Sequence, residues 1–249
     1  MISLDRLTTT GLDSLSLTAR VDTALCVGAG GSSGSLADKP IVRNAAGQLL
    51  IPASQLKGRL RHECEKLARG LGWAICQSPN AETMCPQRLG LTGHFQRDAY
   101  LVSQDPAETD ETESAKHYHC LICQIFGNPA LPARVLFDDL VCTEDLTTLP
   151  EVLRPGVTLN RTRRTAEDKR LYFLETSPAN TALPFAGAIH FQADCPPWAK
   201  ALLLAGLRQI HALGGSKSAG LGWLQWQIDD NDLAIEEGVW EFLAQGGKA

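Results

Sequence analysis

The cysteines are the residues whose types and spacing point most directly to chemistry. The chain holds eight, and Cys120 and Cys123 form a Cys-x-x-Cys pair. That spacing lets two thiolates from one tight turn reach the same tetrahedral ion. Cys76 and Cys85 lie upstream, on either side of a loop that contains Pro and Asn. We expect these four residues to form a closed, structural zinc site without catalytic activity.

Other interpretations of the same cysteines stay open. Four buried free thiols, or a redox-active Cys-x-x-Cys pair, would have the same spacing. If one of the four is not a ligand, the substitutes are Cys64, His117 and His119. A disulfide framework is disfavoured because the chain has 249 residues and its first ten lack the apolar core of a secretory signal. We therefore expect a cytoplasmic protein.

Three further segments could bind phosphate groups, and the first is a basic helix start. The pattern predicts a helix over Gln55–Arg69 with Ser54 as its N-cap. Lys57, Arg59 and Arg61 lie in its first two turns, where free backbone N–H groups and the helix dipole favour anions. A solvated helix face is the simpler interpretation of these charges.

The second segment is a basic hairpin. Residues 156–175 alternate β-formers with arginines, among them Arg161, Arg163 and Arg164. We predict its turn near Ala166-Glu167-Asp168. An exposed basic hairpin can pair with phosphates and insert between nucleotides. The alternative is a charged edge hairpin that resists aggregation.

The third segment is the loop over residues 214–222, which contains four glycines. Gly214, Gly215 and Gly220 expose backbone N–H groups without side-chain bulk, and Ser216 and Lys217 add polar side chains. Such a loop suits close approach to a sugar-phosphate backbone, although it could be only a helix-to-strand turn.

The charge distribution agrees with a nucleic-acid ligand better than the net charge of −5 does. Two acidic segments, 105–113 and 229–241, hold eleven acids and no base, so the rest of the chain is net basic. Local charge decides binding. Because only 15 residues are aromatic and no stacking platform is evident, we expect a nucleic acid to be bound through its sugar-phosphate backbone, without strong sequence preference.

The order of the predicted elements indicates the fold class. Strand, helix, strands, helix and strand follow one another, which is typical of an α+β protein with an antiparallel sheet on the ferredoxin-like βαββαβ plan. No apolar run approaches a membrane span, so we expect no membrane association. We predict helices over 55–69 and 197–213. The predicted strands are 14–27, 49–52, 134–142, 171–175, 187–193 and 223–228. We expect residues 71–121 to form an insertion with little regular structure.

Four motifs, in order, resemble the RAMP superfamily of CRISPR-associated proteins. Residues 51–61 (IPASQLKGRLR) resemble its I-P-G-S-S-L-K-G-x-x-R segment, and Ile125-Phe126-Gly127 with 134–139 (RVLFDD) resembles L-F-G…R-V-x-F-x-D. Residues 156–175 resemble the G-V-x-I-D-R-x-T…L-F-x-x-E hairpin of type III backbone subunits. Residues 214–222 resemble the C-terminal glycine-rich loop. Each motif alone is weak, but together they are specific and cover most of the chain.

The resemblance implies an architecture and a set of partners. The fold would be one domain, 1–249, with a modified ferredoxin-like (RRM-like) palm, an inserted zinc-binding segment at 71–123 and a thumb hairpin at 156–175. The protein would be a backbone subunit of a type III CRISPR effector complex in antiviral defence. Its partners would be the guide CRISPR RNA, a target single-stranded RNA, other RAMP subunits and the large polymerase-like subunit.

The resemblance also implies an activity. Asp38 occupies the place of the loop aspartate that cuts target RNA in the family, although nothing in its local sequence marks it as catalytic. By this resemblance the chain would be an endoribonuclease that uses a divalent cation such as Mg²⁺. Ala53 replaces a glycine of the family pattern and Asn160 an acid. Two alternatives are a non-catalytic scaffold that only binds guide RNA and a guide-processing endoribonuclease with His62 or His211 as the base.

Overall fold

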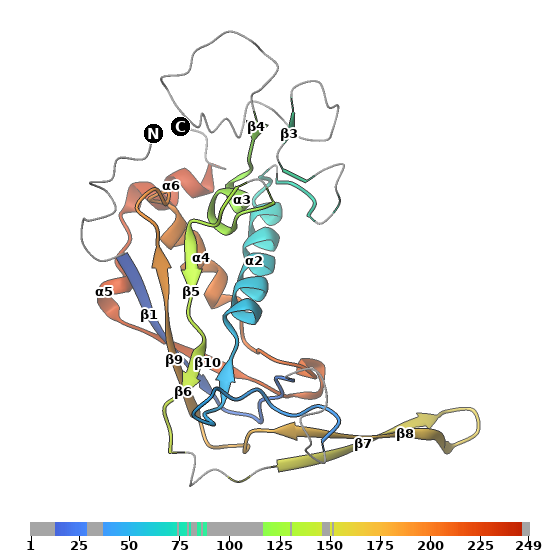
Figure 1. Cartoon of the computed structure of the whole chain (residues 1–249). Helices are drawn as coiled ribbons and strands as arrows, with labels where there is room; N and C mark the ends of the chain where they lie inside the picture. The colour runs from blue at the N-terminus through green and yellow to red at the C-terminus, as the bar shows by residue number, and fades with distance from the viewer. Residues whose placement is uncertain are drawn as a thin grey trace.

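The computed structural model describes residues 13–28, 37–73, 75–78, 80, 84–85, 87–88, 117–129, 131–145, 150 and 152–245. Its centre is an antiparallel sheet with the strand order β10-β1-β9-β6-β2, in which β5 also pairs with β9 (Figure 1). The strands are β1 (Asp13–Val21), β2 (Leu50–Ile51), β5 (Val135–Phe137), β6 (Leu140–Cys142), β9 (Leu183–Phe191) and β10 (Leu224–Ile228). The predicted α+β class with an antiparallel sheet is confirmed.

The two faces of this sheet differ in polarity because side chains alternate along each strand. In β1, Leu15, Leu17, Ala19 and Val21 are buried, and the residues between them are more exposed. The buried face contributes to the same core as helices α2 (Ala53–Gly70) and α4 (Ala199–Arg208). These helices approach closely: a Cβ on Gly206 would lie 2.7 Å from the sulfur of Cys64.

A separate two-stranded sheet extends away from the body (Figure 1). It consists of β7 (Val152–Asn160) and β8 (Thr165–Thr176). The remaining elements are short. They are β3 (Gln87–Arg88), β4 (His117–Tyr118), α3 (Leu121–Phe126), the 3-10 helix η3 (Lys217–Ala219), α5 (Asp230–Leu233) and α6 (Glu237–Ala244). No helix in the described part of the chain is both long and apolar enough to cross a membrane.

Two predicted local details were wrong. Ser54 is not the N-cap of α2, because the helix begins at Ala53, two residues earlier than predicted, with Pro52 in the N-cap position. The backbone N–H of Ala53 instead donates to Oδ1 of Asp139 at 2.7 Å, so a residue from the β5–β6 turn caps the helix. The strand predicted over 134–142 is interrupted at that turn and forms β5 and β6.

The turn of the projecting hairpin also lies earlier than predicted. It spans residues 161–164, and Ala166-Glu167-Asp168 belongs to β8. The cause is Asn160, whose Oδ1 accepts hydrogen bonds from the backbone N–H groups of Thr162 (3.0 Å) and Arg163 (2.9 Å). Asparagine often starts turns in this way. Much of the predicted insertion, including the acidic segment 105–113, lies outside the described residues.

Candidate functional site

Asp38 lies beside the base of the projecting hairpin. Its backbone N–H donates to the carbonyl of Phe173 in β8 at 3.0 Å, and the N–H of Phe173 donates back to Oδ2 of Asp38 at 2.7 Å. The next residue, Lys39, forms a parallel bridge with Leu174. Asp38 is exposed, so its carboxylate is held in place by β8 on one side and is accessible on the other.

A buried carboxylate fixes the segment that follows Asp38. Glu175 is only 7% exposed. Its Oε2 accepts the backbone N–H of Ile41 at 3.1 Å, and its Oε1 pairs with the guanidinium of Arg43 at 3.0 Å. Because burial of a charge is unfavourable unless it is paired, these contacts bind residues 41–43 firmly to the hairpin.

The glycine-rich loop joins the same backbone network. Residue 42 donates to the carbonyl of Val27 at 2.9 Å, and Gly215 donates to the carbonyl of Cys26 at 2.6 Å. The base of the hairpin contacts the same segment, because the N–H of Ser177 donates to the carbonyl of Leu25 at 3.0 Å. Segment 24–28 therefore connects the glycine-rich loop, the Asp38 segment and the hairpin.

The basic residues of α2 are largely engaged within the protein. Arg59 pairs with Glu63 at 2.8 Å, and Arg61 pairs with Glu65 at 3.0 Å. Burial, together with the nearby charge of Arg61, lowers the pKa of Lys57. Ser54 is exposed at the start of the helix. Of the three predicted phosphate-binding cations, Lys57 is the one without an ion pair in the described part of the chain.

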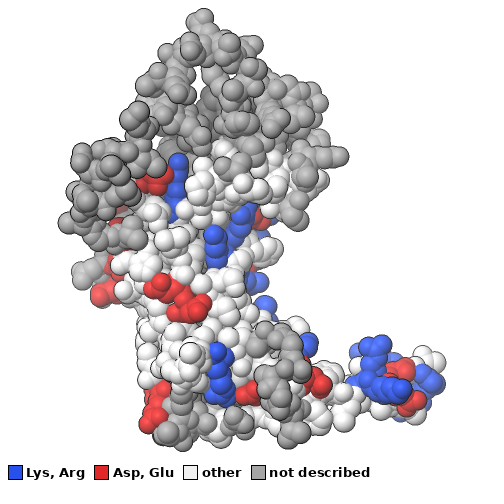
Figure 2. Space-filling view, in the orientation of Figure 1, with Lys and Arg blue, Asp and Glu red and all other residues white. Residues whose placement is uncertain are grey.

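The hairpin presents more accessible charge. Figure 2 shows Lys and Arg side chains gathered at its tip, away from the body. Arg161 and Arg164 are exposed and form no ion pair with any described residue. Arg163 is also exposed but pairs with Glu167 at 3.0 Å.

The glycine-rich loop has few free groups. Gly214 is buried, and Gly215 uses its N–H to bind Cys26. Ser216, Lys217 and Gly220 are exposed. The Lys217 ammonium donates to the carbonyl of Gly214 at 3.0 Å, which holds this side chain against the loop.

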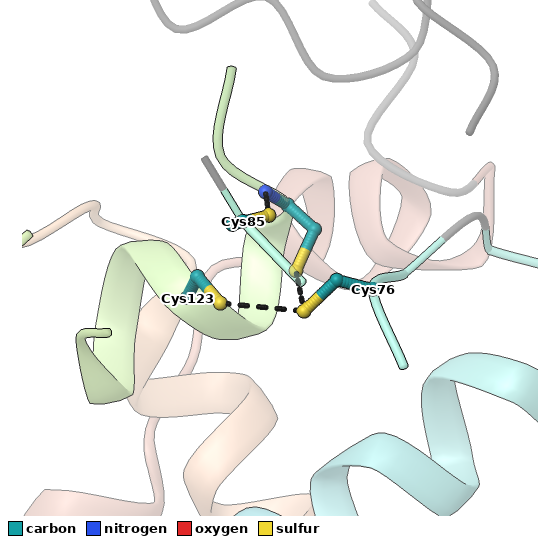
Figure 3. Close-up of side chains that lie close together, drawn as sticks. Cys76, Cys85 and Cys123 are labelled. Carbon is teal, nitrogen blue, oxygen red and sulfur yellow. Dashed lines mark hydrogen bonds between the residues drawn. The ribbon is translucent and has the colours of Figure 1, made fainter. Parts of the chain in front are cut away.

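The four cysteines predicted to bind zinc lie together. All four are buried, and their sulfurs lie within 4.8 Å of one another, the only such cluster found among the described residues. Figure 3 shows the side chains of Cys76, Cys85 and Cys123 converging. The sulfur of Cys76 is 3.6 Å from that of Cys123 and 3.7 Å from that of Cys120. In a tetrahedron with Zn–S bonds of about 2.3 Å, the sulfurs are about 3.8 Å apart, so the donors and spacing fit this ion.

The four thiols share protons unequally, because hydrogen bonds among them lower the pKa values of Cys76 and Cys123 and raise that of Cys120, while the pKa of Cys85 is also raised. Hydrogen bonds from Cys120 and Cys123 lower the pKa of Cys76. The backbone N–H of Cys120 points to the sulfur of Cys85 at 3.3 Å. The Arg61 guanidinium points to the sulfur of Cys123 at 3.7 Å and donates to the carbonyl of Gly127 at 2.9 Å. Arg61 therefore links α2 to the cysteine cluster, a contact that its sequence position does not reveal.

The substitute ligands lie elsewhere or have other partners. Cys64 faces α4, where its sulfur contacts the carbonyl of Leu202 at 3.6 Å. His119 is buried, and its Nδ1 is 2.8 Å from the side-chain nitrogen of Asn128. The side chain of His117 lies outside the described set.

The two histidines considered as processing bases are both exposed, His62 on α2 and His211 after α4. Neither side chain forms a hydrogen bond or ion pair with a described residue. No catalytic arrangement is therefore assembled around them in this part of the chain.

Comparison with known proteins identifies the family. A family model described as the RAMP superfamily matches residues 18–225. The chain belongs to the RAMP superfamily. A search of curated proteins by sequence found no match.

A solved structure agrees with this assignment. The RAMP protein is similar to a chain in the cryo-EM structure of the type III-B Cmr-beta complex bound to cognate target RNA, with a TM-score of 0.52 and 14% identity. The match covers 87% of this chain and 58% of that chain, so this chain spans little more than half of its structural relative. At this identity the similarity establishes a shared fold.

Proposed function

We propose that this RAMP protein is a backbone subunit of a type III CRISPR interference complex, in which it binds guide RNA and cleaves complementary target RNA. Asp38 would act as the catalytic residue. The observation that carries this proposal is the pair of hydrogen bonds between Asp38 and Phe173. They fix the exposed carboxylate of Asp38 at the base of a basic hairpin. An RNA strand that crosses this hairpin would meet the carboxylate there.

The strand order supports the predicted palm. In β10-β1-β9-β6, the central strands β1 and β9 precede α2 and α4 respectively, and the hairpin is inserted between β6 and β9. We interpret this arrangement as a modified ferredoxin-like palm within a single domain, 1–249, with a thumb over 156–175 and a zinc-binding insertion over 71–123.

The chemistry follows from what RNA and the chain each provide. The 2′-OH of RNA is an internal nucleophile, so the protein must hold that oxygen, the phosphorus and the leaving oxygen in line. The thumb would do so by displacing one nucleotide from the stack. A divalent cation such as Mg²⁺, held by Asp38 and a phosphate oxygen, would supply charge neutralisation. Glu175 would keep the Asp38 carboxylate in position relative to the thumb, through its hydrogen bonds to Ile41 and Arg43.

The decisive experiment uses the assembled complex with labelled target RNA. Asp38→Ala should abolish cutting at this subunit's position while guide and target binding persist. Asp138→Ala is the matched control, because Asp138 is also an exposed aspartate but pairs with His190 at 2.9 Å, away from the thumb. The control should cut at the wild-type rate.

Two further measurements test the mechanism. A chelator should stop wild-type cutting, and a deoxyribose at the scissile position should block it. If Asp38→Ala cuts normally, the chain is a scaffold that only binds guide RNA. Cutting of the deoxyribose substrate would exclude attack by the 2′-OH, and chelator-resistant cutting would exclude the cation.

We propose zinc as the ion of the cysteine cluster, held by Cys76, Cys85, Cys120 and Cys123. Four buried sulfurs within 4.8 Å of one another, with Cys76 at 3.6 and 3.7 Å from two of them, support this assignment. Such a site has no open position, so zinc would stabilise the insertion and take no part in cleavage. Metal analysis should give about one zinc per chain, and replacing Cys120 and Cys123 by Ser should remove it. Full zinc content in that double variant would overturn the assignment.

We propose that RNA lies along the thumb, the start of α2 and the glycine-rich loop. The unpaired charges of Arg161 and Arg164 favour the thumb. Ser54, Lys57 and Lys217 would add contacts from the body. Affinity should fall steeply with salt, because each phosphate contact releases counterions.

A further inference from the structure

An exposed tryptophan lies directly after the glycine-rich loop. Trp223 is 50% exposed and begins the strand that continues as β10. Burial alternates along this strand: Leu224 is buried, whereas Trp223, Gln225 and Gln227 are exposed. Because side chains on a strand alternate between faces, the indole lies on the face of the sheet that is opposite the core.

The backbone of Trp223 is fixed. Its N–H donates to Oγ1 of Thr23 at 2.9 Å, and its carbonyl accepts the N–H of Asp22 at 2.8 Å. It also forms a bridge with Ala212. On a fixed backbone, the exposed indole has only its two side-chain torsions to order when a flat ligand stacks on it, so its position favours binding.

An unpaired cation lies on the same face. Arg20 pairs in register with Gln225, so it is a diagonal neighbour of Trp223, at roughly 7–8 Å between strand positions. Arg20 is exposed and forms no ion pair among the residues that the structure describes. The rest of this face near β1 is small or polar, with Thr18 opposite Gln227 and Ala186.

We infer that Trp223 and Arg20 form a nucleotide-binding platform, on which an unpaired RNA base stacks against the indole and the adjoining phosphate pairs with the guanidinium. The spacing suits a single nucleotide, because a long arginine side chain can cover the distance from a stacked base to its phosphate. Asp22 lies opposite Trp223 and would repel a phosphate there, which favours the base on the indole and the phosphate toward Arg20. The inference rests on the proposed RNA binding and is independent of cleavage by Asp38.

The test uses the full chain and a fluorescein-labelled single-stranded RNA of 20 nucleotides, with binding measured by anisotropy. Trp223→Ala should weaken binding about 5- to 140-fold, the usual effect of losing one base stack. Trp223→Phe should retain most of the affinity. Arg20→Gln should weaken binding and make the slope of log affinity against log salt shallower by about 0.7. Trp240→Ala is the matched control, because Trp240 is 40% exposed on α6, and it should bind as wild type.

A second measurement does not depend on the alanine variant folding. RNA should quench tryptophan emission in the wild type, and the quenching should be lost in Trp223→Phe. Unchanged affinity in Trp223→Ala, or equal quenching in Trp223→Phe, would overturn the platform. If Trp223→Ala without RNA forms smaller oligomers than the wild type, the sheet face that carries Trp223 would instead be a contact between copies of the chain. If wild-type protein binds no RNA at all, it is the proposed function that fails.

Discussion

Replacing Gly222 by alanine should destabilise the protein far more than the same change at Gly220. Both glycines have positive φ angles, +71° and +85°. An alanine in this left-handed region costs about 1–2 kcal/mol. A Cβ on Gly220 would meet nothing within 4 Å, so Gly220→Ala should cost only that amount.

The difference arises from the surroundings of Gly222. A Cβ there would lie 1.8 Å from the carbonyl oxygen of Leu213, whereas carbon and oxygen normally stay about 3.3 Å apart. The backbone would have to move by roughly the difference between these distances. That shift would break two bonds, from Leu213 N–H to the Gly222 carbonyl (3.0 Å) and from Gly222 N–H to the Ala24 carbonyl (2.9 Å). With about 1–3 kcal/mol for each of the two broken bonds added to the cost of the positive φ, Gly222→Ala should cost about 3–8 kcal/mol in total.

The assay is urea denaturation of the zinc-loaded full chain, followed by far-UV circular dichroism at 25 °C. The free energies of unfolding of the two variants should differ by about 2–6 kcal/mol, the contribution of the two broken bonds. Equal losses of stability in the two variants would refute the reasoning, because positive φ would then be the whole effect and the close approach of Leu213 irrelevant.

Three other predictions concern single side chains. Asp139→Ala should lower the free energy of unfolding by about 1 kcal/mol, because it removes the cap of α2; urea denaturation checks this, and a loss no larger than that of the exposed Asp138→Ala would contradict it. Burial raises the pKa of Cys195 to about 11. Since the thiolate is the nucleophile, the rate of Cys195 alkylation by iodoacetamide, mapped by mass spectrometry, should increase about tenfold per pH unit from pH 8 to 10. A plateau of this rate near pH 9 would exclude the raised pKa. Arg61→Gln should weaken zinc retention against a chromophoric chelator about 10- to 100-fold. Arg59→Gln is the control and should have no effect, because Arg59 has its ion pair on the same helix. Equal zinc retention in the two variants would show that the contact between Arg61 and Cys123 is unimportant.

The sequence was sufficient for features that depend on local patterns. Alternation predicted a strand over 14–27, which the structure confirms as β1 up to Val21, and the apolar spacing of Leu56, Leu60 and Cys64 predicted α2. The grouping of the four cysteines also followed from their spacing and from the lack of apolar sequence around them. In each case the deciding information lies in residue types at short range.

Features that depend on distant partners could not be predicted in the same way. Ser54 has the side chain of an N-cap, yet Asp139, which is 86 residues from Ala53, provides the cap. Arg61 has the charge of a phosphate ligand, yet it is used by Glu65 and Cys123. Asn160 offered a local signal, because an asparagine before a polar stretch favours a turn at that point. A resemblance to a family motif did not indicate which atoms these side chains would contact.

The contacts of the hairpin suggest how RNA binding and Asp38 are connected. A two-stranded hairpin is marginally stable by itself, and this one exposes Leu159 at 64% and Leu171 at 61%. Its described anchors to the body include the Asp38–Phe173 hydrogen bonds and the Glu175 contacts with residues 41–43. Since a ligand that orders the outer hairpin also reduces its motion at the base, RNA on the thumb would hold Asp38 in place. Under the proposed function, RNA on the thumb would therefore steady the base of the hairpin, to which Asp38 is already hydrogen-bonded.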